Sequence, residues 1–515
     1  MFGVLLWKEI RNHLMTFRFG AALITTFVLI MLSMWVLGED YIRRRNAHNL
    51  AAETSARYDT EEVHVPSGIS PTLYRPPSAL SIFSQGEERR FGNSVQVRRW
   101  EVPRQASGNF GSNLMMVAQP PFDLFTIVAV VLSLFGIILT YDAISGEREK
   151  GILKVQLSCG GSRATLFAAK FIGGVVCLAI PFVFSMAAGF ILLSFVIGVG
   201  FTPLEWAAIA AMIGAALVYG AVFIALGLAC SAAVRRSSVA LVLSLFLWTI
   251  LVIVLPSTAQ SAADTLVPLP SPSQIGNLEK ATEAEAMQME REIRERYPRA
   301  GYGYWTGGFS IGGEGLYFIY DTWPEAFRDA EGFIRELEPY MLSRADRVWN
   351  AFREYESVKI RQAELEQALA FAAPIHHLRN AFNSLAGTNF SNYEDFMGAV
   401  RRYRRELIEN FRRKGYFTSN VLQFFSRIDP EDIDMERFRQ RVEYYNSQLA
   451  SGKRYDEFMG PSYWGPLPAD ETPPVAHSVE KTDFESALWP IAFLVVATAV
   501  LVSAGFGAFL RYDVR

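Results

Sequence analysis

One charged segment sets the class of this chain: Tyr141-Asp142-Ala143-Ile144-Ser145-Gly146-Glu147-Arg148-Glu149-Lys150-Gly151-Ile152-Leu153-Lys154. It lies between two long apolar runs, Leu124 to Thr140 and Phe171 to Val199. A charged loop followed by a short amphipathic segment, set between two membrane spans, is typical of a membrane protein that docks a cytoplasmic partner. The alternative is an ordinary solvated loop that carries the positive charge of the cytoplasmic side.

Six apolar windows predict an all-α membrane protein. Each is nearly free of charged residues and is close to the roughly 20 residues that a helix needs to cross a bilayer. The windows are Phe19–Leu37, Phe122–Thr140, Phe171–Val196, Trp206–Ala229, Val239–Leu255 and Leu488–Leu510. Helices in soluble cores are shorter and more often interrupted, so these windows favour membrane spans.

The windows divide the chain into an ordered set of segments. In chain order these are an interfacial helix (1–18), span one (19–37), a first extracytoplasmic loop (38–121), span two (122–140), a cytoplasmic loop (141–170), spans three to five (171–255), a large helical extracytoplasmic domain (256–487), span six (488–510) and a cytoplasmic tail (511–515). An apolar stripe beside charged residues in 1–18 favours a helix at the lipid surface over a plain extension of span one.

Loop charges predict the orientation. The short segments that carry Lys and Arg all fall on one side if the spans alternate: Lys8, Arg11 and Arg18; Arg148, Lys150, Lys154, Arg163 and Lys170; Arg235 and Arg236; Arg511 and Arg515. By the positive-inside rule this side is cytoplasmic, with both termini inside. The three cysteines avoid both large outer loops, so no disulfide framework is expected there. The formal net charge of −3 argues against a nucleic-acid partner.

No catalytic, cofactor-binding or metal-binding residue is predicted. The sequence lacks the Gly-x-x-x-x-Gly-Lys-Ser/Thr phosphate loop, so this chain does not bind ATP in that manner. His376 and His377 are adjacent, with no cysteine nearby, and are read as structural or surface residues. Asp123, at the outer edge of span two, is read as an interfacial carboxylate in contact with water, not a proton relay.

Two Pro-rich linkers, 267–273 and 461–474, flank a sequence with a mostly helical pattern. This pattern predicts a helical outer domain. Asn277 as a cap and the capping boxes at Thr322–Glu325 and Ser391–Glu394 predict helix starts, and Pro339 is a candidate break in the second of these helices. The basic run Arg401–Arg405 is read as a solvated or ion-paired surface within the domain, with contact to anionic lipid or polysaccharide as the alternative. The many aromatic residues favour a helical core over a glycan-binding or lipid-binding surface.

The quoted segment resembles the cytoplasmic loop of the ABC-2-type permeases, the membrane subunits of one class of ATP-binding-cassette transporter. These carry a Tyr-Asp-x-x-Ser-Gly-Glu-Arg-Glu-x-Gly-Thr-Leu-like loop after their second span, followed by Leu-Ser-x-x-x-Ser-Arg. Here Ile152 stands where Thr is usual, and 157–163 supplies the second part. Leu6–Arg11 is similar to the elbow helix of the family, and Asn383–Phe390 with Tyr403-Arg404 resembles a subgroup with a large outer domain between spans five and six.

The resemblance implies a permease dimer, formed with a second copy or a paralogue and bound to separate ATPase subunits that hold ATP and Mg²⁺. It also implies an ATPase-coupling role for a set of loop residues: Tyr141, Asp142, Glu147, Arg148, Glu149, Gly151, Leu153, Ser162 and Arg163. It identifies no cargo and assigns no role to the outer domain.

Three functions remain open at this point. The first is an exporter subunit in a bacterial cytoplasmic membrane, driven by the partner ATPase. The second is a mechanotransmission or maturation-assembly protein, whose outer domain acts on a periplasmic partner while no cargo crosses the spans. The third is a receptor or scaffold that has no ATPase.

Overall fold

The computed structural model describes residues 2–57, 70–86, 88, 92–106, 122–158, 162–269, 271–298, 315–413, 447, 451 and 482–511. Within these residues six helices are long and apolar enough to cross a membrane, as the sequence predicts. They cover Phe17–Glu53, Leu124–Glu149, Arg163–Ile197, Pro203–Ala233, Ser237–Leu266 and Phe484–Leu510. The prediction of an all-α membrane protein is confirmed.

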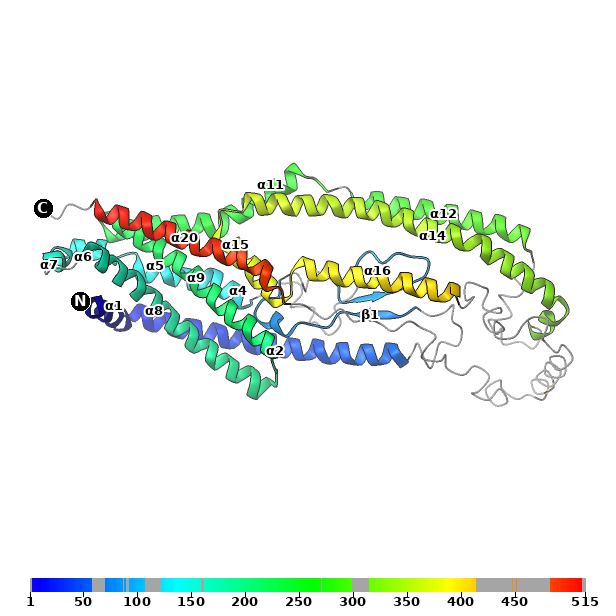
Figure 1. Cartoon of the computed structure of the whole chain (residues 1–515), viewed down its shortest axis with the longest axis horizontal. Coiled ribbons are helices and arrows are strands. Elements are labelled where there is room, and N and C mark those ends of the chain that lie inside the picture. Colours follow the sequence, from blue (N-terminus) through cyan, green and yellow to red (C-terminus); the bar gives the residue numbers. More distant parts are fainter. Residues whose placement is uncertain are drawn as a thin grey trace.

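The membrane part is built from these elements, in chain order: α1 (Phe2–Leu14), α2 (Phe17–Arg57), α4 (Leu124–Thr126), η4 (Ile127–Leu132), α5 (Ser133–Thr140), α6 (Ser145–Glu149), α7 (Ile152–Ser158), α8 (Arg163–Ile191), η5 (Leu192–Ile197), α9 (Pro203–Ala233), α10 (Ser237–Thr249), η6 (Ile250–Val254), α11 (Leu255–Leu266) and α20 (Phe484–Leu510). The turns η4, η5 and η6 are π-helical. The N-terminus, α6, α7 and the C-terminus lie at one end of the elongated molecule (Figure 1).

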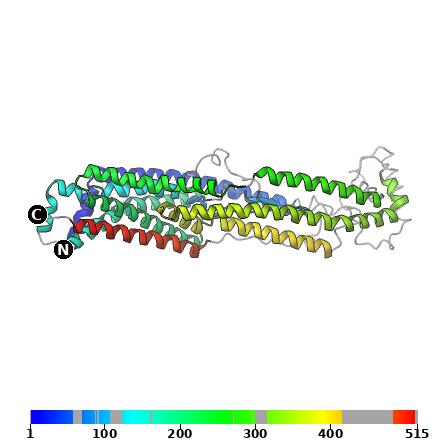
Figure 2. The same ribbon diagram turned by 90° about the horizontal axis from the view of Figure 1, so that it is seen from above.

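The fourth span, α9, is the centre of the bundle. Two-thirds of its apolar window is buried (67%), against 17% for the sixth span, α20, which runs along one edge of the bundle in Figure 2. Small residues allow this close packing. A Cβ atom at Gly227 would overlap Thr140 Oγ1 of α5, so the two helices cross where only glycine fits.

The outer part continues directly from the spans. Its elements are β1 (Thr72–Tyr74), η3 (Ala79–Ile82), β2 (Ser94–Gln96), α12 (Pro272–Arg296), α14 (Gly315–Leu369), α15 (Pro374–Ala386) and α16 (Phe390–Arg413). The 41 residues of α2 form one unbroken helix, about 60 Å long. Its first part is span one, and its last part extends beyond the bundle (Figure 1). Beyond the bundle, α12 and α14 run side by side, with Ile293 packed on Phe333 and Leu337 (Figures 1 and 2).

Two segments of the outer part return to the bundle and share its core. Leu80 and Phe83 of the first loop and Phe382 of α15 belong to the same buried cluster as the spans. Ser78 Oγ donates to the Ala386 carbonyl at 2.8 Å, and Ser84 Oγ donates to Asn383 Oδ1 at 2.8 Å. The outer loops are thus fastened to each other and to the outer end of the bundle.

His377 has a structural place in this junction. Its ring stacks on Phe493 of α20 at 3.7 Å between centroids, and Nε2 donates to the Phe371 carbonyl at 2.8 Å. Asp123 differs from the sequence interpretation, because its carboxylate is 1% exposed. It accepts from Thr126 N and Gln85 N, so it caps α4 and ties the first loop to span two instead of facing water.

The two outer loops also share a small core of their own. Antiparallel strands β1 and β2 pack Leu73, Val95 and Val97 against Phe396 and Met397 of α16. Within the basic run, Arg404 is buried and donates to the carbonyls of Arg98 and Arg99, at 3.3 and 2.8 Å. Arg402 and Arg405 are exposed as the sequence predicts, but for Arg404 the prediction of a solvated or ion-paired residue is wrong, because its guanidinium is buried against carbonyls of the first outer loop.

Helix starts in the outer domain differ from the capping-box predictions. Ser271 caps α12, and the Asn389 side chain accepts from Asn392 N at the start of α16. The helix α14 runs through Thr322 and Pro339 without a new start. Packing of Phe333 and Leu337 against α12 accounts for the continuity at Pro339, because tertiary contacts outweigh a single local signal there.

Candidate functional site

The quoted loop folds as two short helices joined by a sharp turn. After span two ends at Thr140, the chain turns into α6, and Gly151 with φ +73° separates α6 from α7. This left-handed conformation strains residues that carry a Cβ, which explains glycine at this position. Ser162 then caps α8 by accepting from Thr165 N at 3.1 Å. Gly151 and Ser162 therefore shape the backbone of the loop.

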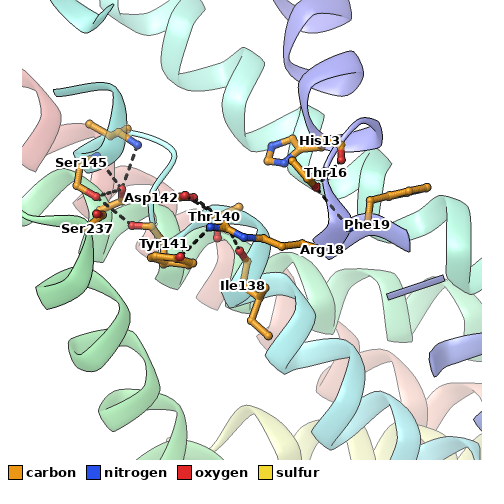
Figure 3. A network of polar contacts seen from close by, with 12 residues as sticks. His13, Thr16, Arg18, Phe19, Ile138, Thr140, Tyr141, Asp142, Ser145 and Ser237 are labelled. Carbon is orange, nitrogen blue, oxygen red and sulfur yellow. Dashed lines mark hydrogen bonds and ion pairs between the residues drawn. The ribbon is translucent and has the colours of Figure 1, made fainter. Parts of the chain in front are cut away.

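Tyr141 and Asp142 are held by the first span. Arg18 Nη1 donates to both carboxylate oxygens of Asp142 at 3.0 Å, and Nη2 donates to Tyr141 Oη at 2.8 Å (Figure 3). The same guanidinium lies over the Tyr141 ring, 4.8 Å from its centroid. Arg18 also donates to the Ile138 carbonyl, so one side chain fixes the exit of span two.

Arg148 and Glu149 join the ends of spans four and five. Arg148 donates to the Val234 and Ala232 carbonyls at 3.0 and 3.4 Å, which satisfies groups left open where α9 ends. Glu149 accepts from Ser237 N and Ser237 Oγ, both at 2.9 Å, and so caps the start of α10.

A buried serine completes this attachment. Ser231 Oγ of α9 accepts from Ile144 N and Ser145 N, both at 3.0 Å. Ile144 and Ser145 are thereby bound to the C-terminal end of the central span, α9. The loop cannot move away from α9 without breaking these bonds and leaving buried polar groups unpaired, which is costly.

The remaining predicted residues also face inward. Glu147 forms an ion pair with Lys170 of α8 at 2.8 Å and accepts from Gln156 of α7 at 3.0 Å. Leu153 is fully buried against a cluster from α8, α9 and α20. Arg163 donates to the Leu510 carbonyl at 2.7 Å, which joins the start of α8 to the end of α20.

Most of the exposed side of the loop is formed by other residues, although Glu149, Gly151 and Ser162 of the predicted set are exposed as well. Lys150, Gly151, Ile152, Lys154 and Val155 face outward. Two of them are apolar, with Ile152 42% and Val155 61% exposed. We call these five residues the outer face of the loop. The sequence therefore located the loop, and the structure separates the side chains that anchor it from those that it presents.

Sequence reasoning missed the anchoring partners Arg18, Lys170, Ser231 and Ser237. Arg18 and Lys170 were counted only as charges for the positive-inside rule. Their positions at the very ends of apolar runs could have indicated a structural role. The serines carried no such signal, because their partners lie 86 and 88 residues away along the chain. Among the described residues, no group of three or more His, Cys, Asp or Glu side chains is placed to hold a metal ion.

Comparison with known proteins agrees with this architecture. Curated proteins yield no match to the chain. The family model described as ABC-2 family transporter protein matches residues 4–514, nearly the whole chain. The protein therefore belongs to the ABC-2 family of transporter membrane proteins.

Proposed function

We propose that this chain is the permease subunit of an ATP-binding-cassette exporter and couples ATP hydrolysis by a separate ATPase subunit to movement of a substrate. ATP and Mg²⁺ belong to that partner, since this sequence has no phosphate loop. The observation that carries the proposal is the anchored loop, with Glu147, Arg148 and Glu149 bonded to three different spans.

The outer face of the loop suits a protein partner. Ile152 and Val155 supply exposed apolar surface, and Lys150 and Lys154 flank it with positive charge. Apolar side chains surrounded by charges are typical of an interface with an apolar centre and a polar rim. We expect the ATPase to bind here, and the inward-facing residues to pass its movement to the bundle.

The anchors define the route of that movement. Asp142 leads to α2 through Arg18, Glu147 leads to α8 through Lys170, and Arg148 leads to the end of α9. Buried and half-buried contacts of this kind transmit displacement, because close-packed interiors deform little. A displacement of the loop would therefore be transmitted to α2, α8 and α9 together.

A second candidate function, force transmission to an extracytoplasmic partner, is favoured by how the outer part is attached. Span one continues as a single helix into the outer region, and α15 packs among the spans through Phe382 and His377. A rearrangement of the spans would therefore move the outer domain. On this reading a periplasmic protein receives the motion and no cargo crosses the spans.

We further propose that the chain works in a bacterial cytoplasmic membrane with both termini inside, as a dimer with a second copy or a paralogue. Support for contact with lipid comes from α1, whose Val4 and Trp7 are 75% and 64% exposed beside Lys8 and Arg11. An apolar surface rimmed by cations suits the interface of an anionic membrane.

The test is recovery of partners with the tagged full-length chain from mild detergent. We expect an ATP-binding subunit in roughly equal amount with the parent, and its loss with Ile152→Asp, because a carboxylate at the centre of the interface is desolvated on binding. The matched control is Ile360→Asp on α14, where isoleucine is 45% exposed, close to the 42% of Ile152.

Three outcomes would change the conclusion. Recovery of the ATPase with Ile152→Asp at the level of the parent would remove the outer face as its binding site. Absence of any ATPase with the parent would return the loop to an ordinary cytoplasmic loop. A periplasmic protein recovered together with the ATPase would favour force transmission over export.

A further inference from the structure

A lysine is buried at the cytoplasmic end of the third span. Lys170 of α8 has a side chain that is 2% exposed. Its Nζ atom lies 3.3 Å from Glu9 Oε1 of α1 and 2.8 Å from Glu147 Oε2 of α6. The three side chains, which we call the Lys170 triad, come from the elbow helix, the cytoplasmic loop and a membrane span.

The packing of α1 on α8 brings the carboxylate of Glu9 to Lys170. Gly173 lies one turn along α8, and a Cβ atom there would be 3.1 Å from Glu9 Cβ. The helices therefore approach closely at this point, and Glu9 is 4% exposed although the helix lies at the surface of the bundle. A buried carboxylate is costly unless it is paired, so Glu9 depends on Lys170.

Lys170 is the cation between Glu9 and Glu147, because the neighbouring polar groups are neutral or paired elsewhere. Burial lowers the pKa of His13, one turn along α1 from Glu9, which favours the neutral imidazole. Arg18 is engaged by Asp142 and Tyr141. Gln156 contributes a neutral amide to the other oxygen of Glu147.

The two carboxylates differ in exposure. The Glu9 side chain is 6% exposed and that of Glu147 is 16% exposed. Because two carboxylates share one ammonium, Lys170 keeps a counter-ion even when one of them moves. Glu9 is the more buried anchor, and Glu147 is the contact that brings the loop to it.

We propose that Lys170 is a positioning residue that fixes the cytoplasmic loop and α1 to one point of α8, so that all three move as one body when a partner acts on the loop. The role in coupling rests on the proposed function, whereas the fixing of the loop does not. Without the triad, the loop would keep its attachments to α2, α9 and α10 and the apolar contact of Leu5 with its cluster, but would lose its charged link to α1 through Lys170.

The test measures the distance between α1 and α7 in the full-length chain. Spin labels are placed at the exposed positions Val4 and Lys154 in a background with the native cysteines replaced, Cys159→Ser, Cys177→Ala and Cys230→Ala. Pulsed electron spin resonance should give one narrow distance distribution in the parent. We expect Lys170→Met to broaden it, and Lys170→Arg to restore most of the narrow form.

Removal of Lys170 alone leaves the carboxylates of Glu9 and Glu147 without a cationic partner, so that variant can fail to fold. The triple variant Glu9→Gln, Lys170→Met, Glu147→Gln removes all three charges and avoids this problem. We expect it to unfold at the temperature of the parent and still give the broad distribution. Lys150→Met, on the exposed side of the same loop, is the control and should remain narrow.

The outcomes separate the two proposals. A narrow distribution in the triple variant would overturn the role of Lys170, whatever binds the loop. A broad one supports it. The distances are measured without nucleotide or partner, so failure to recover an ATPase with the parent would count against the proposed function alone.

Discussion

Arg18 and Asp142, 124 residues apart in the chain, are joined by hydrogen bonds from Arg18 Nη1 to both carboxylate oxygens at 3.0 Å. This pair links the start of span one to the turn that follows span two. It also holds Tyr141, whose hydroxyl accepts from the other nitrogen of the same guanidinium. The first two residues of the quoted loop thus serve to fix its origin.

We expect Arg18→Met and Asp142→Asn to be coupled by about 1 kcal/mol in a double-mutant cycle of unfolding free energy. The value is modest because the side chains are 36% and 33% exposed, and solvent screens the pair. Thermal unfolding in detergent provides the measurement. Arg11→Met, at an exposed position on α1, serves as the control with Asp142→Asn. Strict additivity of the Arg18 and Asp142 effects would contradict the pairing.

Removal of the Arg404 side chain should weaken the attachment between the first outer loop and α16. Arg404→Met deletes the bonds to the Arg98 and Arg99 carbonyls, and we expect a loss of about 2 kcal/mol in the stability of the outer domain. Arg405→Met is a matched control, because Arg405 is exposed on the same helix. The rate of limited proteolysis in the outer domain reports the difference. Equal rates for the two variants would show that Arg404 does not join the loops.

A carboxyl of the outer domain gives a pH dependence. Burial, and then the neighbouring charge of Glu394, raise the pKa of Glu356 to about 7, against the opposing effects of Arg401 and Lys359. The unfolded chain releases this proton near the ordinary carboxyl pKa, so the folded state binds more protons between there and pH 7. Stability due to this group is therefore full at acidic pH and falls as the pH rises to about 7.

Glu356→Gln should remove that loss. We expect the variant to be more stable than the parent at pH 8 by about 1–2 kcal/mol, after a discount for solvent around a half-buried group, and nearly equal to it at pH 4. Unfolding of the outer domain measured at both pH values checks this. A variant whose advantage does not change with pH would show that Glu356 titrates normally.

The spans were predictable because their signal is local. Each apolar window needs only its own composition and length to be recognised, and the six helices appear where these windows lie. Helix ends in the outer domain were less predictable. Asn389, not Ser391, supplies the cap of α16. The helix α14 continues past Pro339, because packing of Phe333 and Leu337 against α12 outweighs a single local signal.

The candidate site also has features that the sequence predicts and features that only the packing of the helices decides. The sequence by itself determined that a charged, glycine-punctuated loop follows the second span, because apolar runs, charges and glycines are recognised from local composition. Only the tertiary structure decided which side chains anchor the loop and which it presents. Glu149 meets Ser237 across 88 residues, and Glu147 meets Lys170 on another helix. Such pairs depend on how the helices pack, and no local pattern encodes that packing.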